Sequence, residues 1–280
     1  MEKFLEIKKD KLGIGTWKMG DYSVNRKEEI ESIRYALNNG IKLIDTAEMY
    51  GNGNSERLVA EAIKGFDREK LYLVSKVLPS NAGEENIFNS CEKSLKNLNT
   101  DYLDLYLLHW RGSIPFEETI SCMEKLKSDG KIKDWGVSNM DIDDMKEILS
   151  LKNGQNCLVN QVLYHLGSRG IEYSLKNFTD DNGITTMAYC PLAQGGTLKK
   201  QLLSSKSVLE VSKKYGISPI QVLLVYILQK ENTISIPKAS KLAHMKEIIL
   251  CKDIQIQKED ILLLENEYPK PKKKMPLDIE

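Results

Sequence analysis

The chain lacks an excess of charge of either sign, and it lacks long apolar runs. Its 280 residues contain 40 basic and 40 acidic side chains, which gives a formal net charge of +0 at pH 7. A neutral chain offers no bulk attraction to nucleic acid or to an anionic membrane, so we expect neither as a partner. The longest apolar run, Val222 to Leu228, is far too short to span a bilayer, and the N-terminal segment has no apolar core typical of a signal peptide.

Cysteine is also scarce and follows no pattern. Five cysteines, at positions 91, 122, 157, 190 and 251, form no CxxC pair. An odd, scattered count predicts reduced thiols in the cytoplasm and argues against a disulfide framework or a zinc site. Because no other cluster of histidine, cysteine and carboxylate residues has metal-ligand spacing, we expect a metal-free site.

What the sequence does contain is an ordinary globular composition arranged as a repeat. Hydrophobic residues make up 41% of the chain and charged residues 29%, which suffices for a core. Short apolar runs alternate with amphipathic helical stretches, and strands are predicted near 11–16, 42–47, 71–77, 104–110, 133–139, 157–162, 185–190 and 233–237. Eight strands of this kind predict an α/β fold, a (β/α)8 TIM barrel, that occupies residues 1–280 as a single domain.

The last third of the chain departs from a simple repeat. Helices are predicted over 205–215, 218–230, 242–250 and 258–267, so the barrel should carry extra C-terminal helices. The lysine-rich end that follows them is predicted to be a solvated, disordered tail.

Polar residues end most of the predicted strands. They are Thr16, Asp45, Lys76, His109, Ser138 with Asn139, Gln161, Tyr189 and Lys238. Because all strands of a parallel barrel open on one face, these residues should converge at one mouth. Packing alone does not explain ionisable groups at the ends of strands two, three and four.

The stretch LIDTAEMYGNGNSE, from Leu43 to Glu56, adds a phenol to this group. Asp45 stands at the exit of the strand and Tyr50 in the loop after it. A nearby ammonium stabilises a phenolate, so Lys76 is expected to lower the pKa of Tyr50 and favour release of its proton. Asp45 would hold Lys76, and His109 would orient a substrate oxygen. Each residue alone has an ordinary structural explanation, but together they favour a site for proton delivery.

At these residues the chain resembles the aldo-keto reductase family. The motifs GIGTWKMG, LIDTAEMYGNGNSE, LVSKV, DLYLLHW, GVSNM, VNQVLYHL, AYCPLAQGG and IPKASKLAHMKE occur in family order over nearly the whole chain. The resemblance implies reversible, NADPH-dependent reduction of aldehyde or ketone carbonyls to alcohols. It also implies that Tyr50 is the general acid, that Asp45 and Lys76 tune it, and that His109 positions the carbonyl.

The resemblance implies a cofactor site as well. Tyr189 would stack on the nicotinamide, the loop from Leu192 to Thr197 would approach the pyrophosphate, and Lys238 would lie beside the adenosine 2′-phosphate. Ser138, Asn139 and Gln161 would form hydrogen bonds with the carboxamide group of the nicotinamide. The full set expected at the cofactor is Gly15, Thr16, Trp17, Asp45, Ser138, Asn139, Gln161, Tyr189, Cys190, Pro191, Leu192, Gly195, Gly196, Lys238, Ala239, His244 and Glu247.

Three positions depart from the family pattern. His244 stands where an arginine often grips a phosphate, and Ile248 stands where an asparagine often contacts adenine. These changes leave NADPH favoured over NADH only moderately. Cys190 follows Tyr189 where serine is common, and a buried, inert thiol is the preferred interpretation over a reactive one.

Substrate choice is the least defined part of the prediction. Trp17, Met49 and Trp110 match pocket positions of the family and would join Tyr50 and His109 around a small carbonyl substrate. Short loops after strand four and after the last helix predict an open, permissive pocket. Two alternatives stay open: an NADPH-binding redox sensor or regulatory subunit with little turnover, and a phosphate-handling barrel lyase or isomerase. We expect a monomer or a weak homo-oligomer.

Overall fold

Eight parallel strands follow one another in chain order and close into a barrel. The computed structural model describes residues 2–279, and within them the strands are β1 (Ile14–Gly15), β2 (Leu43–Asp45), β3 (Tyr72–Val77), β4 (Leu103–Leu108), β5 (Ile132–Ser138), β6 (Cys157–Leu163), β7 (Thr185–Tyr189) and β8 (Thr233–Ser235). A parallel bridge between Leu12 and Ser235 joins the two ends of the sheet, and the N–H of Gly13 donates to the Ser235 carbonyl at 2.8 Å. The predicted (β/α)8 architecture is confirmed, although β1 is shorter than the predicted strand at 11–16.

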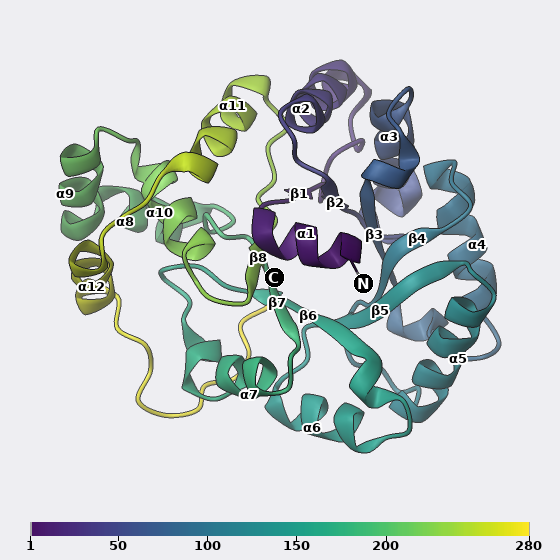
Figure 1. The fold of residues 1–280 in the computed structure, drawn as a ribbon. Coiled ribbons are helices and arrows are strands. Elements are labelled where there is room, and N and C mark those ends of the chain that lie inside the picture. Colours follow the sequence, from purple (N-terminus) through teal and green to yellow (C-terminus); the bar gives the residue numbers. More distant parts are fainter. Residues whose placement is uncertain (1, 280) are drawn as a thin grey trace.

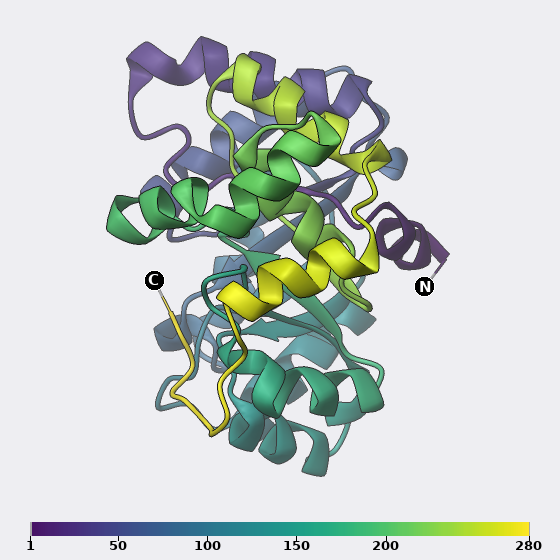
Figure 2. The same cartoon turned by 90° about the vertical axis from the view of Figure 1, so that its left-hand side faces the viewer.

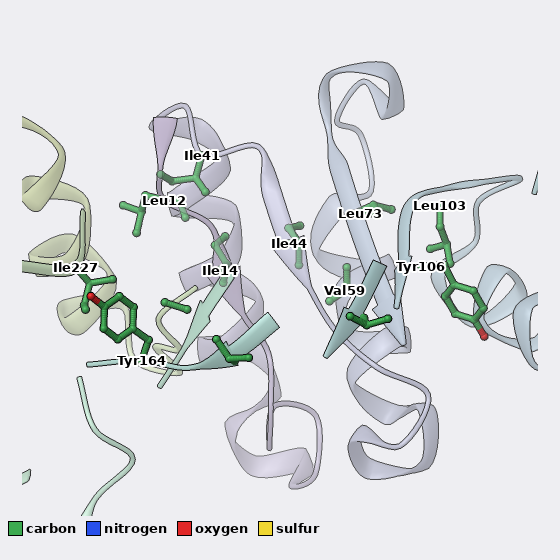
Figure 3. Close-up of a cluster of buried hydrophobic side chains, with 14 of the residues drawn as sticks. Leu12, Ile14, Ile41, Ile44, Val59, Leu73, Leu103, Tyr106, Tyr164 and Ile227 are labelled. Atoms are coloured by element: carbon green, nitrogen blue, oxygen red, sulfur yellow. The ribbon is translucent and has the colours of Figure 1, made fainter. Parts of the chain in front are cut away.

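Helices cover the outside of the barrel (Figure 1). They are α2 (Arg26–Asn38), α3 (Asn54–Ile63), α4 (Ile87–Leu98), α5 (Phe116–Ser128), α6 (Ile142–Ser150), α7 (Leu175–Asp181), α8 (Gly196–Ser204), α9 (Lys206–Tyr215), α10 (Pro219–Leu228), α11 (Leu242–Leu250) and α12 (Lys258–Glu267). In α4, for example, the buried positions recur at helical spacing, so one apolar face of this helix packs toward the strands. Figure 3 shows part of the resulting core, to which Val59 of α3 and Tyr106 of β4 belong.

The sequence predicted most helix boundaries in the last third of the chain. The predicted helices at 242–250 and 258–267 are α11 and α12, and those at 205–215 and 218–230 are α9 and α10. Ser218 begins α10 with a capping box, in which its hydroxyl accepts from the N–H of Gln221 at 3.2 Å. Helix α8 was not predicted, because its first residues were interpreted as part of a glycine-rich loop.

A further helix, α1 (Glu2–Asp10), lies across the end of the barrel that is opposite the mouth, and the sequence did not predict it. In Figure 1 it crosses the centre of the ring of strands. Phe4 and Ile7 are buried and enter the apolar interior of the barrel, where they join Leu43, Tyr72, Val74, Leu105, Leu107, Val159, Met187, Ile234 and Ile236. The Lys3 ammonium binds Asp104 of β4 at 2.6 Å. Helix α1 therefore closes this end.

The lysine-rich tail is anchored against the barrel, so the prediction of a disordered tail was wrong. Lys274 lies 3.3 Å from Asp141 and 3.1 Å from Asp143, which precede and begin α6. The Ser168 hydroxyl, in the loop after β6, donates to Asp278. Figure 2 shows the tail ending on the side of the molecule away from α1. The acidic residues around the start of α6 attract the tail, which sequence position alone did not reveal.

Candidate active site

A cavity opens at the carboxyl ends of the strands. Its empty space, including the open mouth, is about 730 Å³. It is lined by Gly15, Thr16, Trp17, Asp45, Met49, Tyr50, His109, Ser138, Asn139, Gln161, Tyr189, Cys190, Ile236 and Lys238. Except for Ile236, each of these residues was named from the sequence as a site residue. The βα topology thus brings together residues that lie more than two hundred positions apart in the chain.

The Lys76 ammonium is fully buried beside this cavity. It donates to Asp45 Oδ2 at 2.7 Å, to the Thr46 carbonyl at 2.8 Å and to the Tyr50 hydroxyl at 3.1 Å, so each of its three protons has an acceptor. Asp45 of β2 pairs in register with Val74 of β3. Lys76 is two residues beyond Val74 and therefore faces the same side of the sheet as Val74.

Burial dominates the protonation of these groups. It raises the pKa of Asp45 and lowers the pKa of Lys76, while the charge of each opposes the shift of the other. Burial also raises the pKa of Tyr50 well above its usual range, and the Asp45 charge adds to this. The expectation that Lys76 lowers the pKa of Tyr50 was therefore wrong, because the phenolate would lose more hydration than the ammonium replaces. Tyr50 is a protonated phenol at neutral pH.

The imidazole of His109 lies beside this phenol. The two ring centroids are 5.8 Å apart, with an interplanar angle of 72°. Burial, with a smaller contribution from the Lys76 charge, lowers the pKa of His109 to about 2, so the ring is neutral. In residues 2–279 the buried Nδ1 has no hydrogen-bond partner. Because a buried N–H without an acceptor is costly, the single proton of the neutral ring belongs on Nε2.

The sequence profile of the aldo/keto reductase family matches residues 11–267. The chain belongs to this family. It is 48% identical over 268 residues to methylglyoxal reductase YeaE of Escherichia coli K12, covering 96% of this chain and 94% of that protein. It is 36% identical over 252 residues to glyoxal reductase of Bacillus subtilis, covering 89% and 85%.

The fold agrees with the family assignment. A crystal structure of an aldo/keto reductase from Klebsiella pneumoniae in complex with NADP and acetate matches with a TM-score of 0.93 at 43% identity, over 96% of this chain and 95% of that one. The predicted family and the predicted enzyme class, an oxidoreductase, are confirmed. The regulatory alternative finds no support in these comparisons, and the lyase or isomerase alternative is excluded by the family.

In this aldo/keto reductase, the residues expected to bind the nicotinamide carboxamide form hydrogen bonds with other residues of the site. Gln161 Nε2 donates to Asp45 Oδ1 at 2.7 Å, and the Ser138 hydroxyl donates to the Gln161 carbonyl at 2.9 Å. The Tyr189 hydroxyl donates to Asn139 Oδ1 at 2.9 Å. Gln161 thus joins the ionisable group as a second donor to Asp45, a contact that the sequence did not predict.

A second cavity continues from the first and shares Trp17, Cys190 and Lys238 with it. Lys18, Pro191, Leu192, Ala193, Gln194, Lys199 and Pro237 also line it. Three lysines along one groove suit the phosphates of a dinucleotide, so the residues present fit NADPH. Lys18 and Lys199 were missed in the sequence, where isolated lysines give no signal of a site.

The backbone around both cavities is strained. Lys18, Asn139, Cys190 and Ala193 have φ of 58°, 58°, 48° and 53°, in the left-handed region that non-glycine residues avoid. Such residues persist only where the surrounding structure holds them, and they cluster at functional sites. Asparagine tolerates this conformation, so only Asn139 carried a hint of it in the sequence.

Several predicted residues lie outside both cavities. Trp110 is 37% exposed and packs beside His109, with ring centroids 4.8 Å apart. Ala239 is buried, His244 is exposed on α11, and the Glu247 carboxylate accepts from the Ser218 hydroxyl. Gly195 and Gly196 begin α8 and face open space, since an added Cβ would meet no atom within 4 Å. Ile248 belongs to the buried core.

The described residues show neither a membrane-spanning helix nor a cluster of metal ligands. Within 2–279 no helix is long and apolar enough to cross a membrane. No group of three or more histidine, cysteine, aspartate or glutamate residues in this part of the chain is arranged to hold a metal ion.

Proposed function

We propose that this aldo/keto reductase uses NADPH to reduce small aldehydes and ketones reversibly to alcohols, with α-oxoaldehydes such as methylglyoxal and glyoxal as the favoured class. The names of its relatives support the substrate class, and the complexes of similar structures with NADP and NADPH support the cofactor. The observation that carries the proposal is the protonated phenol of Tyr50, which faces the cavity while its oxygen accepts from the buried Lys76 ammonium.

Bound NADPH would supply a hydride to the substrate carbon. In our proposal Lys18, Lys199 and Lys238 hold its phosphates, and Tyr189 with Asn139 lies against its nicotinamide. Lys238 is exposed on the groove, and partial desolvation by its neighbours lowers its pKa, so a bound phosphate would favour its charged form. NADH is the weaker cofactor in this proposal, because it lacks the 2′-phosphate.

Side chains of the site would then transfer one proton to the substrate. Tyr50 donates its proton to the carbonyl oxygen as negative charge develops there, and the Lys76 ammonium stabilises the phenolate that remains. Asp45 keeps Lys76 charged and in place. The neutral His109 donates from Nε2 to the same oxygen and orients it. In the reverse direction the Tyr50 phenolate takes the proton from the alcohol.

The remaining expectations are part of the same proposal. Residues 1–280 form one domain that works as a monomer or weak homo-oligomer in the cytoplasm and binds no nucleic acid. Neutral net charge supports the last point. Cys91, Cys122, Cys157 and Cys251 are buried and form no disulfide, as suits a reducing compartment. Met49, which lines the first cavity and is 40% exposed, favours a permissive pocket.

The test is the loss of NADPH absorbance with a panel of α-oxoaldehydes, simple aldehydes, ketones and quinones, run in parallel with NADH. We expect turnover that prefers NADPH and that falls by about 10³-fold in Tyr50→Phe. Tyr173→Phe, which changes an exposed tyrosine, is the matched control and should match the unmodified enzyme. NADP⁺ binding followed by protein fluorescence should be equal in all three proteins. Normal turnover by Tyr50→Phe would refute the proposed acid.

A further inference from the structure

The turn that carries Tyr50, η2 (Tyr50–Gly53), has a left-handed backbone. Its residues Gly51 to Gly53 have φ of 55°, 53° and 85° in succession. Glycine adopts these angles freely and asparagine tolerates them, so neighbouring groups are needed to fix one conformation of this turn. Arg57 of α3 supplies part of this support, since its Nη2 donates to the Asn52 carbonyl at 3.3 Å and to Asn54 Oδ1 at 2.7 Å.

A buried carboxylate connects this support to the strand that carries Lys76. Arg57 Nη1 donates to Asn97 Oδ1 at 3.0 Å, and Asn97 Nδ2 donates to Glu56 Oε2 at 2.8 Å. The other carboxylate oxygen of Glu56 accepts from the Ser75 hydroxyl at 2.7 Å, and Ser75 directly precedes Lys76 on β3. Hydrogen bonds therefore run from the η2 turn through α3 and α4, which are neighbours in Figure 1, to β3.

Apolar packing gives no reason for an acidic residue at the buried position of Glu56. Its side chain is 0% exposed, and its hydrogen-bond donors within residues 2–279 are the neutral groups of Ser75 and Asn97. A carboxylate buried in this way is unfavourable unless a cation lies nearby. The charge of Glu56 acts on Lys76, where it favours the protonated ammonium against the effect of burial. The other ionisable groups that face this ammonium are Asp45, Tyr50 and His109.

We propose that Glu56 is a positioning residue for the reduction, which fixes the 3.1 Å spacing between Lys76 and the Tyr50 hydroxyl and supports the charge of the ammonium. The inference rests on the proposed function, in which Tyr50 releases its proton beside Lys76. Glu56 lines neither cavity and acts through Ser75 on one side and Asn97 on the other.

The test compares Glu56→Gln with Glu61→Gln. Both residues lie on α3, but Glu61 is exposed and pairs with Arg26 at 2.7 Å. Glu56→Gln keeps the size of the side chain and removes its charge, so we expect kcat to fall about tenfold while KM and NADPH affinity stay within about twofold. The alkaline limb of the kcat profile should move to lower pH by roughly half a unit to one unit, because Lys76 loses its proton more easily. Glu61→Gln should change neither.

A second measurement does not depend on turnover. In protein labelled with ¹³C at the lysine ε-carbon, the Lys76 resonance is assigned by its loss in Lys76→Met, and its titration should shift to lower pH in Glu56→Gln. If the Lys76 titration shifts but the protein reduces no carbonyl compound, the proposed function is refuted while the effect of Glu56 on Lys76 stands. If Glu56→Gln lowers kcat or stability but moves neither the Lys76 titration nor the pH profile of kcat, the positioning role of Glu56 is overturned. If Glu56→Gln does not fold, Ser75→Ala should lower kcat severalfold, and an unchanged kcat would overturn the proposal.

Discussion

The two ends of the barrel each hold a lysine–aspartate pair, and the pairs differ in their surroundings. At the mouth, Lys76 and Asp45 lie 2.7 Å apart with side-chain exposures of 0% and 3%. At the closed end, Lys3 and Asp104 lie 2.6 Å apart with exposures of 27% and 3%. At the first pair the Tyr50 hydroxyl accepts from Lys76 and borders a cavity. At the second, Lys3 lies 6.0 Å from the centre of the Tyr72 ring without a hydrogen bond to its hydroxyl, and Arg68 lies 2.8 Å from Asp104. The same pair suits chemistry at the mouth and attachment of α1 at the closed end.

This difference shows that a buried ion pair alone does not identify an active site. Asp104 accepts from Lys3 and from the Leu73 N–H, and Phe4 and Ile7 fill the space beside it with apolar atoms. At the mouth the polar groups instead border a cavity and strained backbone. In barrels of this type the carboxyl-terminal face carries the reaction and the opposite face carries stability. Substitutions at the two ends should therefore separate loss of activity from loss of stability.

The largest expected effect belongs to Lys76→Met. The Asp45 carboxylate would remain buried beside Gln161 without a cation, which costs about 3 to 5 kcal/mol of unfolding free energy. Activity should fall at least about 100-fold as well, because the Tyr50 phenolate loses its ammonium. Urea unfolding and kcat measured on the same preparation check both effects. Loss of stability with unchanged kcat would make the mouth pair equivalent to the pair at the closed end.

Phe4→Ala should give the opposite pattern. The ring fills the closed end of the barrel interior, and removing a buried phenylalanine ring costs about 3 kcal/mol of unfolding free energy. The kcat per folded molecule should not change, because the mouth lies at the other end of the strands. Leu5→Ala, on the same helix but 49% exposed, is the control and should cost little. A change in kcat without a change in stability would contradict the assignment of α1 to stability alone.

The mouth should also respond to acid in a way that the closed end does not. Burial lowers the pKa of His109 from 6.5 to about 2 and that of His165 from 6.5 to about 4. Between these values and 6.5 the unfolded chain binds more protons than the native protein, so unfolding free energy falls as pH falls. His109 and His165 each contribute about 1 kcal/mol between pH 7 and pH 5.5.

His109→Gln should remove the contribution of His109 and roughly halve the pH dependence of stability that the two histidines give. Phe4→Ala should lower stability equally at both pH values, because that end of the barrel interior has no histidine. Urea unfolding of the three proteins at pH 7 and pH 5.5 measures the difference. An unchanged pH dependence in His109→Gln would show that the imidazole is hydrated and free to take up a proton.

The mouth was far easier to predict from the sequence than the closed end. Strand ends recur once in each βα repeat, so Asp45, Lys76 and His109 could be assigned to one face before any contact was known. Helix α1 could not be predicted, because its only apolar residues, Phe4, Leu5 and Ile7, stand in a short charged segment. What makes that segment a helix is tertiary contact with the barrel interior, which no local pattern records.

Within the site, the types of residue were predictable but their mutual bonds were not. The hydrogen bond from Gln161 to Asp45 joins β6 to β2 across the barrel, and a sequence contains no measure of that distance. The direction of the Tyr50 pKa shift depends on the balance of burial against charge, which also requires coordinates. Cys190 and Ala193 have a left-handed backbone conformation that cysteine and alanine ordinarily avoid, so their residue types did not predict it.

The smallest effect is expected for Lys3→Met at the closed end. Asp104 would keep Arg68 and the Leu73 N–H, so its charge stays compensated and unfolding free energy should fall by about 1 kcal/mol or less. Because Lys3 is partly exposed, most of this difference should vanish in 1 M salt. Lys42→Met is the control: it breaks an exposed pair between Glu6 of α1 and Lys42, which precedes β2, and should not change stability measurably. A loss as large as that of Lys76→Met would mean that Arg68 does not compensate Asp104, and that the closed end depends on its ion pair as strongly as the mouth does.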